Sequence, residues 1–240
     1  MIQTLHSNDR CVVGFRQRDK VDAPSLTRSS QMNHSNSVHP PLSWVMRVTV
    51  AEPFDLTSLS ARLLLQPPVK PQEPLPVASV AIIINPKDRG GSILLIKRIE
   101  RSNDPWSGQI GFPGGHKSPD DSGFLQTAIR EAEEEVGIKL SQNELLGCLP
   151  FVATRSRCVQ VVPFVFSLKS RVEVRMNREV AESFWVPLSE LARLEGARRR
   201  VHAEGQDLEV NSYDYHGRVI WGLTFRVLNL LLGRIVKEDL

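Results

Sequence analysis

The sequence predicts an α/β domain in which strands and helices alternate. Runs rich in β-branched residues recur beyond Pro76, and the segments 124–136 and 223–236 repeat apolar residues with the period of an amphipathic helix. Hydrophobic residues make up 41% and charged residues 24% of the 240-residue chain, which is the balance of a globular protein. This composition excludes a wholly disordered chain and a collagen-like fibre.

Three regions of the chain differ in composition. Residues 1–45 are rich in Ser, Asn, Gln and Arg, so we expect a disordered tail that buries too little apolar surface to fold. Residues 46–76 predict a short helix, 55–65, and a proline-rich linker, and residues 77–236 the folded domain. The tail has two other interpretations: an over-extended start with Met46 as the true beginning, or a transit peptide, against which its acidic residues count.

Within the domain, the expected elements follow one another in a regular order. Strands are expected at 77–84, 92–96, 145–154, 158–168 and 184–186, and helices at 124–136, 187–194 and 223–236. A Gly/Pro loop, 108–116, precedes the first of these helices, which stops at Gly137, the residue type that best closes a helix. The triple Arg198-Arg199-Arg200 is interpreted as a solvated loop.

Cysteine content and net charge limit the kinds of partner and the cellular compartment that we expect. Three cysteines without a CxxC pair favour a reducing, cytoplasmic setting, and a net charge of +3 is too small to argue for nucleic-acid binding. No apolar run approaches the roughly 20 residues that a membrane-spanning helix needs. We therefore expect a cytoplasmic protein with a small-molecule partner and neither nucleic acid nor membrane, and a homodimer stays open.

The helix 124–136 carries a cluster of carboxylates. On a helical wheel Glu131, Glu134 and Glu135 fall on one face, apart from the apolar stripe that includes Val136. Carboxylates at i, i+3 and i+4 repel one another, whereas a hard divalent cation such as Mg²⁺ or Mn²⁺ binds carboxylate oxygens. For an isolated cluster of this kind, the alternative is a solvated acidic face; Glu133 points elsewhere and is expected to be solvated.

The residues upstream favour the metal-binding interpretation. Phe112-Pro113-Gly114-Gly115 lets the backbone approach a ligand closely, Asp121 follows, and the helix reads Arg130-Glu131-Ala132-Glu133-Glu134-Glu135-Val136-Gly137-Ile138. This series resembles the signature of Nudix hydrolases: Gly, five residues, Glu, seven residues, then Arg-Glu-aliphatic-x-Glu-Glu-x-Gly-aliphatic. The resemblance extends over about 77–232 and implies a Nudix-type α/β/α sandwich with a mixed β-sheet.

Two departures from that signature indicate a branch of the family. Asp121 replaces the first glutamate, and eight residues rather than seven separate it from Arg130. Both features, and the run Thr127-Ala128-Ile129-Arg130-Glu131-Ala132, resemble the coenzyme A pyrophosphatase branch. The branch's upstream pattern is only partly present, because four positions differ from it: Ile96, Ile99, Asn103 or Asp104, and Gly108.

The resemblance implies a divalent-metal-dependent hydrolase that cleaves a diphosphate linkage in coenzyme A or a related nucleoside diphosphate derivative, with Mg²⁺ or Mn²⁺ as cofactor. It implies metal ligands at Glu131, Glu134 and Glu135, and Arg130 as the residue that orients a glutamate. Glu179, six residues before Trp185, is the expected further ligand or general base, with Glu182 as its alternate. The expected catalytic set is therefore Glu131, Glu134, Glu179 and Arg130.

The remaining candidates surround this set. Gly114 and Gly115 are expected to shape the loop that meets the substrate, and Arg98 and Arg101 to hold phosphates. Asp121 either acts behind the metal ligands or simply starts the helix, and His116 either contacts phosphate or is a loop residue.

Two other functions stay open at this point. One is hydrolysis of ADP-ribose or another nucleoside diphosphate derivative. The other is a catalytically silent Nudix module that binds a nucleotide and regulates a partner; such modules usually lose a glutamate that is present here.

Overall fold

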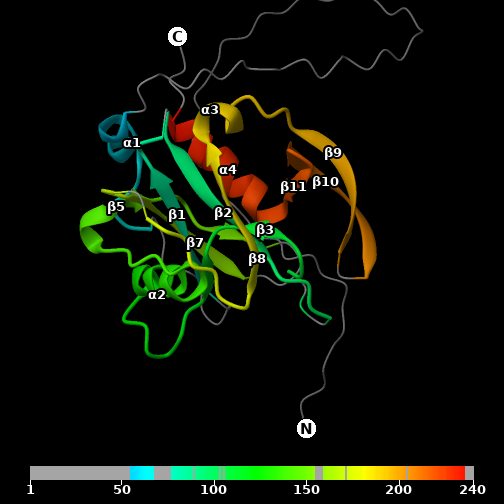
Figure 1. Ribbon diagram of the computed structural model, residues 1–240, viewed down its shortest axis with the longest axis horizontal. Coiled ribbons are helices and arrows are strands. Elements are labelled where there is room, and N and C mark those ends of the chain that lie inside the picture. Colours follow the sequence, from blue (N-terminus) through cyan, green and yellow to red (C-terminus); the bar gives the residue numbers. More distant parts are fainter. Residues whose placement is uncertain are drawn as a thin grey trace, which may run out of the picture. The chain divides into compact units, whose positions relative to one another are not determined.

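A mixed β-sheet built around strand β1 (Val77–Asn85) forms the centre of the fold (Figure 1). The computed structural model describes residues 55–67 and 77–235 except 89, 103, 105, 155–158, 171 and 204. β1 pairs in parallel with β7 (Gln160–Ser167) along nearly its whole length, while the other pairings of this sheet are antiparallel. The predicted tail, most of the linker, Asn103 and Cys158 lie outside the described residues.

β1 and β2 (Ser92–Arg98) pair only where the chain turns between them, at Ile84–Ile93 and Asn85–Ser92. Beyond this point β3 (Ile110–Gly111) pairs with β2, and β4 (Gly114–His116) pairs with β1. The Gly/Pro segment that was predicted as a loop therefore forms two short strands along the edges that β1 and β2 leave unpaired.

The outer strands complete the sheet. β8 (Val180–Pro187) pairs with β2, and it begins earlier than the predicted strand 184–186. β5 (Leu145–Cys148) and β6 (Val152–Ala153) both pair with β7, so the single strand predicted at 145–154 is two short strands with an irregular stretch between them.

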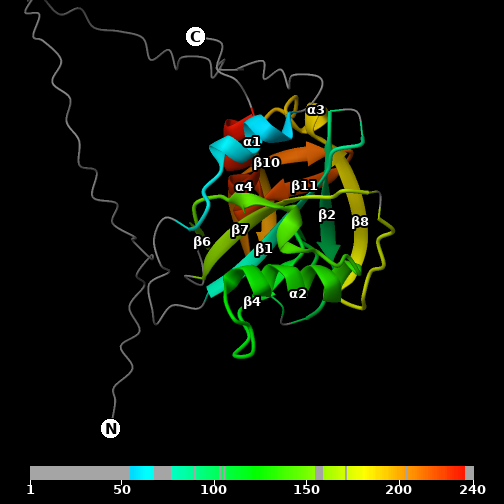
Figure 2. The same ribbon diagram turned by 90° about the vertical axis from the view of Figure 1, so that its left-hand side faces the viewer.

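Two hydrophobic cores lie on opposite faces of the sheet, because successive side chains of a strand point to opposite faces. In β1, Ile82 and Ile84 belong to one core, and Ala81 and Ile83 to the other. Helix α2 (Phe124–Val136) covers the second core, with the bounds that the sequence predicted. Figure 2 shows α2 on one side of the sheet and α4 on the other.

The opposite face carries α4 (Gly222–Ile235), α1 (Leu56–Arg62) and the short helix α3 (Leu188–Leu191). Thr224 of α4 donates a hydrogen bond of 2.8 Å from its hydroxyl to the carbonyl of Ile110, which fixes β3 against the helix. These layers confirm the predicted α/β/α sandwich with a mixed sheet. None of the helices in the described part of the chain has the length and hydrophobicity to span a bilayer.

A second sheet was not predicted. It consists of β9 (Ala197–Ala203), β10 (Gln206–Tyr215) and β11 (Arg218–Trp221), paired antiparallel in the order β11-β10-β9. The interpretation of Arg198-Arg199-Arg200 as a loop was wrong, because these arginines lie within β9. Two of them form cross-strand ion pairs, which let a charged run occupy a strand: Arg199 with Asp214 at 2.8 Å and Arg198 with Glu209 at 3.9 Å.

Candidate functional site

β4 lies between β1 and helix α2, and two glycines allow these close approaches, Gly114 on the side of β1 and Gly115 on the side of α2. A Cβ atom on Gly114 would overlap the carbonyl of Ser79, and one on Gly115 would overlap the carboxylate of Glu131. The amide of Gly114 donates a 2.9 Å hydrogen bond to Oε2 of Glu135. Gly114 and Gly115, predicted to shape the loop, thus bring a backbone strand directly onto the acidic face of α2.

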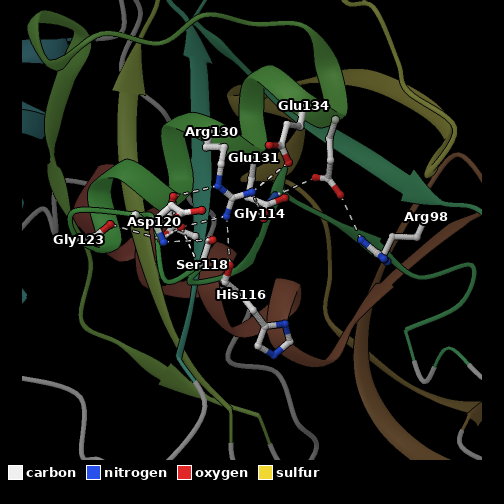
Figure 3. Close-up of polar contacts among 12 residues, drawn as sticks. Arg98, Gly114, His116, Ser118, Asp120, Gly123, Arg130, Glu131 and Glu134 are labelled. Carbon is white, nitrogen blue, oxygen red and sulfur yellow. Dashed lines mark hydrogen bonds and ion pairs between the residues drawn. The ribbon is translucent and has the colours of Figure 1, made fainter.

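Arg130 connects the acidic residues of α2 to one another (Figure 3). Its Nη1 atom lies 2.8 Å from Oε1 of Glu131 and 3.0 Å from Oε2 of Glu134. Its Nε and Nη2 atoms form a bidentate pair with Asp121, at 2.9 and 3.0 Å, and Nη2 also donates to the carbonyl of His116 at 3.2 Å. One guanidinium therefore fixes the positions of two glutamates, and Asp121 fixes the guanidinium.

Asp121 is buried and fully hydrogen-bonded. Besides Arg130, it accepts bonds from the amide of Ser118 at 2.8 Å and from the hydroxyl of Thr127 at 2.9 Å. The hydrogen bonds from Arg130 lower the pKa of Asp121 below its ordinary value, and those from Ser118 and Thr127 add to the effect. Asp121 thus holds Arg130, and the cap position of α2 itself is Gly123, which makes no side-chain cap bond.

Glu131 and Glu135 occupy surroundings that disfavour their charge. Burial raises the pKa of Glu131, and the charges of Glu134 and Asp121 raise it further against the opposing effect of Arg130. Glu135 is only 2% exposed, and burial raises its pKa to about 7, with contributions from the charges of Glu131 and Glu179. The amide of Gly114 and the charge of Arg98 act in the opposite direction.

Arg98, the last residue of β2, and Arg101, three residues further on, both reach this site. Arg98 lies 3.2 Å from Oε1 of Glu135 and 3.5 Å from Oδ2 of Asp104, so its guanidinium bridges α2 and the loop before β3. Arg101 is more exposed and lies 3.5 Å from Oε1 of Glu179. The two predicted phosphate-binding residues are therefore both at the site, but only Arg98 contacts an α2 glutamate.

Glu179 and Glu182, the two candidates for the further ligand or general base, have different surroundings in the structure. Glu179 precedes β8 and is held by a 2.8 Å bond from its amide to Asn177, whose own amide donates to the carbonyl of Glu135. Glu182 instead contacts Arg218 of β11, with Nε at 3.1 Å, and that guanidinium covers the ring of Phe184. Glu179 is therefore beside the acidic helix, whereas Glu182 is engaged with the second sheet.

The ring of His116 points away from the carboxylates (Figure 3). Its centroid lies 6.0 Å from that of the Trp106 ring in a tilted arrangement. His116 thus contributes its carbonyl to Arg130, and its ring does not take part in the acidic cluster, which is formed by Glu131, Glu134 and Glu135. Nothing in the residue pattern pointed to Asp104 as the partner of Arg98, and Thr127 was noted only as part of a motif, although a hydroxyl six residues after an acid can return to it across a helix start.

The acidic cluster suits a hard divalent cation. Among the described residues, no three His, Cys, Asp or Glu side chains are arranged so that together they could already hold a metal ion. Arg130 contacts Glu131 and Glu134, and Arg98 contacts Glu135. The donor atoms are all carboxylate oxygens, and burial together with neighbouring carboxylates raises the pKa values of Glu131 and Glu135. A divalent cation would relieve this repulsion, so the residues present fit such an ion.

Comparison with known proteins identifies the class to which this fold and site belong. A family model for the NUDIX domain matches residues 74–205, more than half of the chain. The chain therefore belongs to the Nudix family and is a pyrophosphohydrolase that acts on phosphoric anhydrides. Nudix hydrolases generally use divalent metal ions, in agreement with the chemistry of the acidic cluster.

Particular relatives are curated bacterial proteins named NudL and described as uncharacterized Nudix hydrolases. The chain is 35% identical over 156 residues to the protein from Photorhabdus laumondii, covering 64% of this chain and 81% of the relative. It is 34% identical over 157 residues to that from Yersinia enterocolitica, covering 65% and 80%. Among solved structures, the NUDIX domain of Shewanella oneidensis NrtR, complexed with ADP ribose, matches 51% of this chain and 79% of its own at 22% identity and a TM-score of 0.42.

We predict that Asp121→Asn lowers the free energy of unfolding at neutral pH by about 2 to 3 kcal/mol. The substitution removes the charge that pairs with Arg130 while keeping the size of the side chain. Chemical denaturation of both proteins measures the difference. The matched control is Asp120→Asn, an exposed neighbour, which should change the unfolding free energy by less than about 0.5 kcal/mol.

The pair of Asp121 and Arg130 should also make the free energy of unfolding depend on pH. Because the pKa of Asp121 is lower in the folded state, its contribution is complete above the unfolded value of about 3.9 and is lost as the pH falls toward the folded value. The difference between wild type and Asp121→Asn should therefore be constant above about pH 5 and shrink below about pH 4. A difference that grows on acidification would contradict this account.

Proposed function

We propose that this protein hydrolyses the diphosphate linkage of coenzyme A or of a related nucleoside diphosphate derivative, with Mg²⁺ or Mn²⁺ bound at Glu131, Glu134 and Glu135. The single observation that carries the proposal is the network in which Arg130 bonds two of these glutamates while Gly114 and Arg98 bond the third. This network places three carboxylates on one side of α2, beside a glycine strand whose backbone a ligand can approach.

The side chains of this network hold the groups on which hydrolysis depends. The bound cation would neutralise charge on the diphosphate oxygens and lower the pKa of an attacking water. Arg130 keeps Glu131 and Glu134 in fixed positions, and Asp121 in turn keeps Arg130 in place. Such rigid positioning is what electrostatic stabilisation of a transition state requires.

Glu179 is our candidate for the general base. Its charge contributes to the raised pKa of Glu135, so it belongs to the same electrostatic cluster, and its carboxylate is partly exposed. A partly exposed carboxylate can accept a proton from water and release it to solvent. Glu182 is not available for this role while Arg218 binds it.

Two features support an active enzyme with coenzyme A as the leading substrate. The three glutamates proposed as metal ligands and Arg130 are all present, and each glutamate is bonded by Arg130 or by Gly114, which argues against a silent regulatory module. The Thr127-to-Ala132 run and the aspartate at position 121 resemble the coenzyme A branch, and Asp121 and Thr127 are bonded to each other. ADP-ribose and other nucleoside diphosphate derivatives are the alternative substrates.

We predict that Glu134→Gln and Glu135→Gln each lower kcat by at least about 100-fold, because each removes charge that binds the cation. The assay incubates the full chain with Mg²⁺ or Mn²⁺ and a panel of diphosphates, and identifies the products. Glu133→Gln, on the same helix but paired with Lys139 at the surface, is the control and should retain wild-type turnover. Undiminished turnover in excess chelator would exclude the proposed metal site.

Glu179→Gln should lower kcat by about 100-fold or more with little change in KM, since it removes a proton acceptor and leaves the ligands of α2 intact. Glu182→Gln provides the comparison, because this carboxylate is bound by Arg218 and lies outside the proposed mechanism. Steady-state kinetics of the two variants separate the roles. If Glu182→Gln shows the larger loss of kcat, the assignment of the base must be reversed.

Arg101 is our candidate for the 3′-phosphate of coenzyme A, because it is more exposed than Arg98 and pairs with one carboxylate, Glu179, where Arg98 pairs with two. We predict that the factor by which Arg101→Ala raises KM is about tenfold larger for coenzyme A than for ADP-ribose, which lacks that phosphate. Arg193→Ala, an exposed arginine after α3, should leave both KM values unchanged. If the wild-type kcat/KM is at least tenfold higher for ADP-ribose than for coenzyme A, the proposed substrate is wrong. The assignment to the Nudix family would not change.

A further inference from the structure

A pocket of about 330 Å³ lies between the loop that precedes β3 and the three-stranded sheet, outside the acidic cluster. Its volume is at the lower end of the range for small-molecule sites, about 300 to 1,000 Å³. Eight residues line it: Asp104, Ser107, Gly108, Gln109, Val201, His202, Ala203 and Trp221. It is formed in part by β9 and β11 (orange in Figure 1), which belong to the sheet that the sequence did not predict.

The sheet side of this pocket combines apolar and aromatic side chains with His202 of β9, which is exposed and pairs with Asp207 at 2.9 Å. Trp221 of β11 pairs with Ser212, which pairs with Ala197 of β9, so Trp221 and Ala197 share a face of the sheet. Val201 and Ala203 lie at even spacing from Ala197 along β9 and share that face as well. Trp221, Val201 and Ala203 are all half-buried, and together they present an indole beside two small apolar side chains.

The loop side of the pocket is polar and internally bonded. Asp104 accepts from the amide of Trp106 at 2.9 Å, and its carbonyl accepts from the amide of Ser107 at 3.0 Å. Gln109 is anchored to β2 through its carbonyl, which accepts from the amide of Arg98 at 3.0 Å. The described residues that this loop contributes to the pocket therefore carry a carboxylate, a hydroxyl and an amide, across from the side chains of the sheet.

The pocket adjoins the acidic site through a single side chain. Arg98 contacts Asp104, which lines the pocket, and Glu135, which belongs to the acidic cluster. A ligand in the pocket would thus lie beside Asp104, the residue through which Arg98 connects the pocket to Glu135. None of the eight lining residues is Lys or Arg, and Asp104 carries negative charge, so the pocket itself disfavours a phosphate.

We propose that this pocket binds the nucleoside end of the substrate, with the base against Trp221 and its polar edge toward Asp104 and Gln109. A nucleobase combines an apolar face with a hydrogen-bonding edge, and this matches an aromatic floor with a polar wall. A carboxylate accepts hydrogen bonds from an exocyclic amino group or a ribose hydroxyl, and an amide can both donate and accept. The inference rests on the proposed function and specifies which part of the diphosphate substrate enters this pocket.

The test is calorimetric titration of AMP into the full-length, metal-free protein. Trp221→Ala should raise the Kd for AMP about tenfold, equivalent to about 1.4 kcal/mol, whereas Trp221→Phe should stay within threefold of wild type. Ala203→Leu, which fills the pocket without removing the indole, should also raise the Kd about tenfold. Val219→Ala is the matched control, because Val219 shares the face of Trp221 but does not line the pocket.

The outcomes distinguish this inference from the proposed function. An AMP Kd within twofold of wild type in Ala203→Leu or in a folded Trp221→Ala protein overturns the nucleoside pocket, even if the enzyme still hydrolyses its substrate. Binding of phosphopantetheine that depends on Trp221, with AMP binding independent of it, also overturns it. Loss of AMP affinity in both variants, in a protein that hydrolyses no diphosphate with Mg²⁺ or Mn²⁺, supports the pocket and overturns the proposed function.

Discussion

The bidentate pair between Arg130 and Asp121 is the interaction on which the acidic site depends. Glu131 and Glu134 each accept a bond from the same nitrogen of Arg130, so their positions follow from that of the guanidinium. The guanidinium is in turn fixed by a buried carboxylate that two other groups, the amide of Ser118 and the hydroxyl of Thr127, hold in place. Without Asp121, Arg130 would keep its contacts with Glu131, Glu134 and the carbonyl of His116 but lose the bidentate pair that fixes the plane of its guanidinium.

This arrangement gives the aspartate at position 121 a structural explanation. Its contacts with Ser118 and Thr127 lie at the start of α2, and its pair with Arg130 reaches the middle of the helix. The acidic face is left to the glutamates, which Gly114 and Arg98 approach from the strands. Two sets of carboxylates thus perform different tasks: one holds the helix and its arginine, and the other remains for a cation.

The part of the fold governed by local patterns could be predicted from the sequence. Helix α2 has the predicted bounds because its apolar period is regular and Gly137 adopts the left-handed conformation that ends it. The central strands were predictable because β-branched residues dominate them. The three-stranded sheet was not, since arginines at 198–200 hide the strand and are accommodated by partners on β10 that only the folded register reveals.

The site, too, has a part that the sequence predicts and a part that only the structure shows. The glutamates, Arg130 and the glycines stand in a recognisable series, so the sequence predicts them as a group. The choice between Glu179 and Glu182, and the partner of Arg98, depend on contacts between distant segments. The pocket beside Trp221 joins residues more than ninety positions apart, and no local pattern could assemble them.

The parallel pairing of β1 with β7 has a consequence for how the enzyme forms. Val77 pairs with Gln160, more than eighty positions away, so the central pair of strands closes a long loop that contains the whole acidic helix. Contacts of such high sequence separation form slowly, because the entropy of loop closure must be overcome first. β4 pairs with β1 over fewer than forty positions, so the glycine strand and the glutamates can meet before β7 joins the sheet. During synthesis α2 leaves the ribosome before β7, and the core that α2 covers is completed only when Val162, Phe164 and Phe166 of β7 join it.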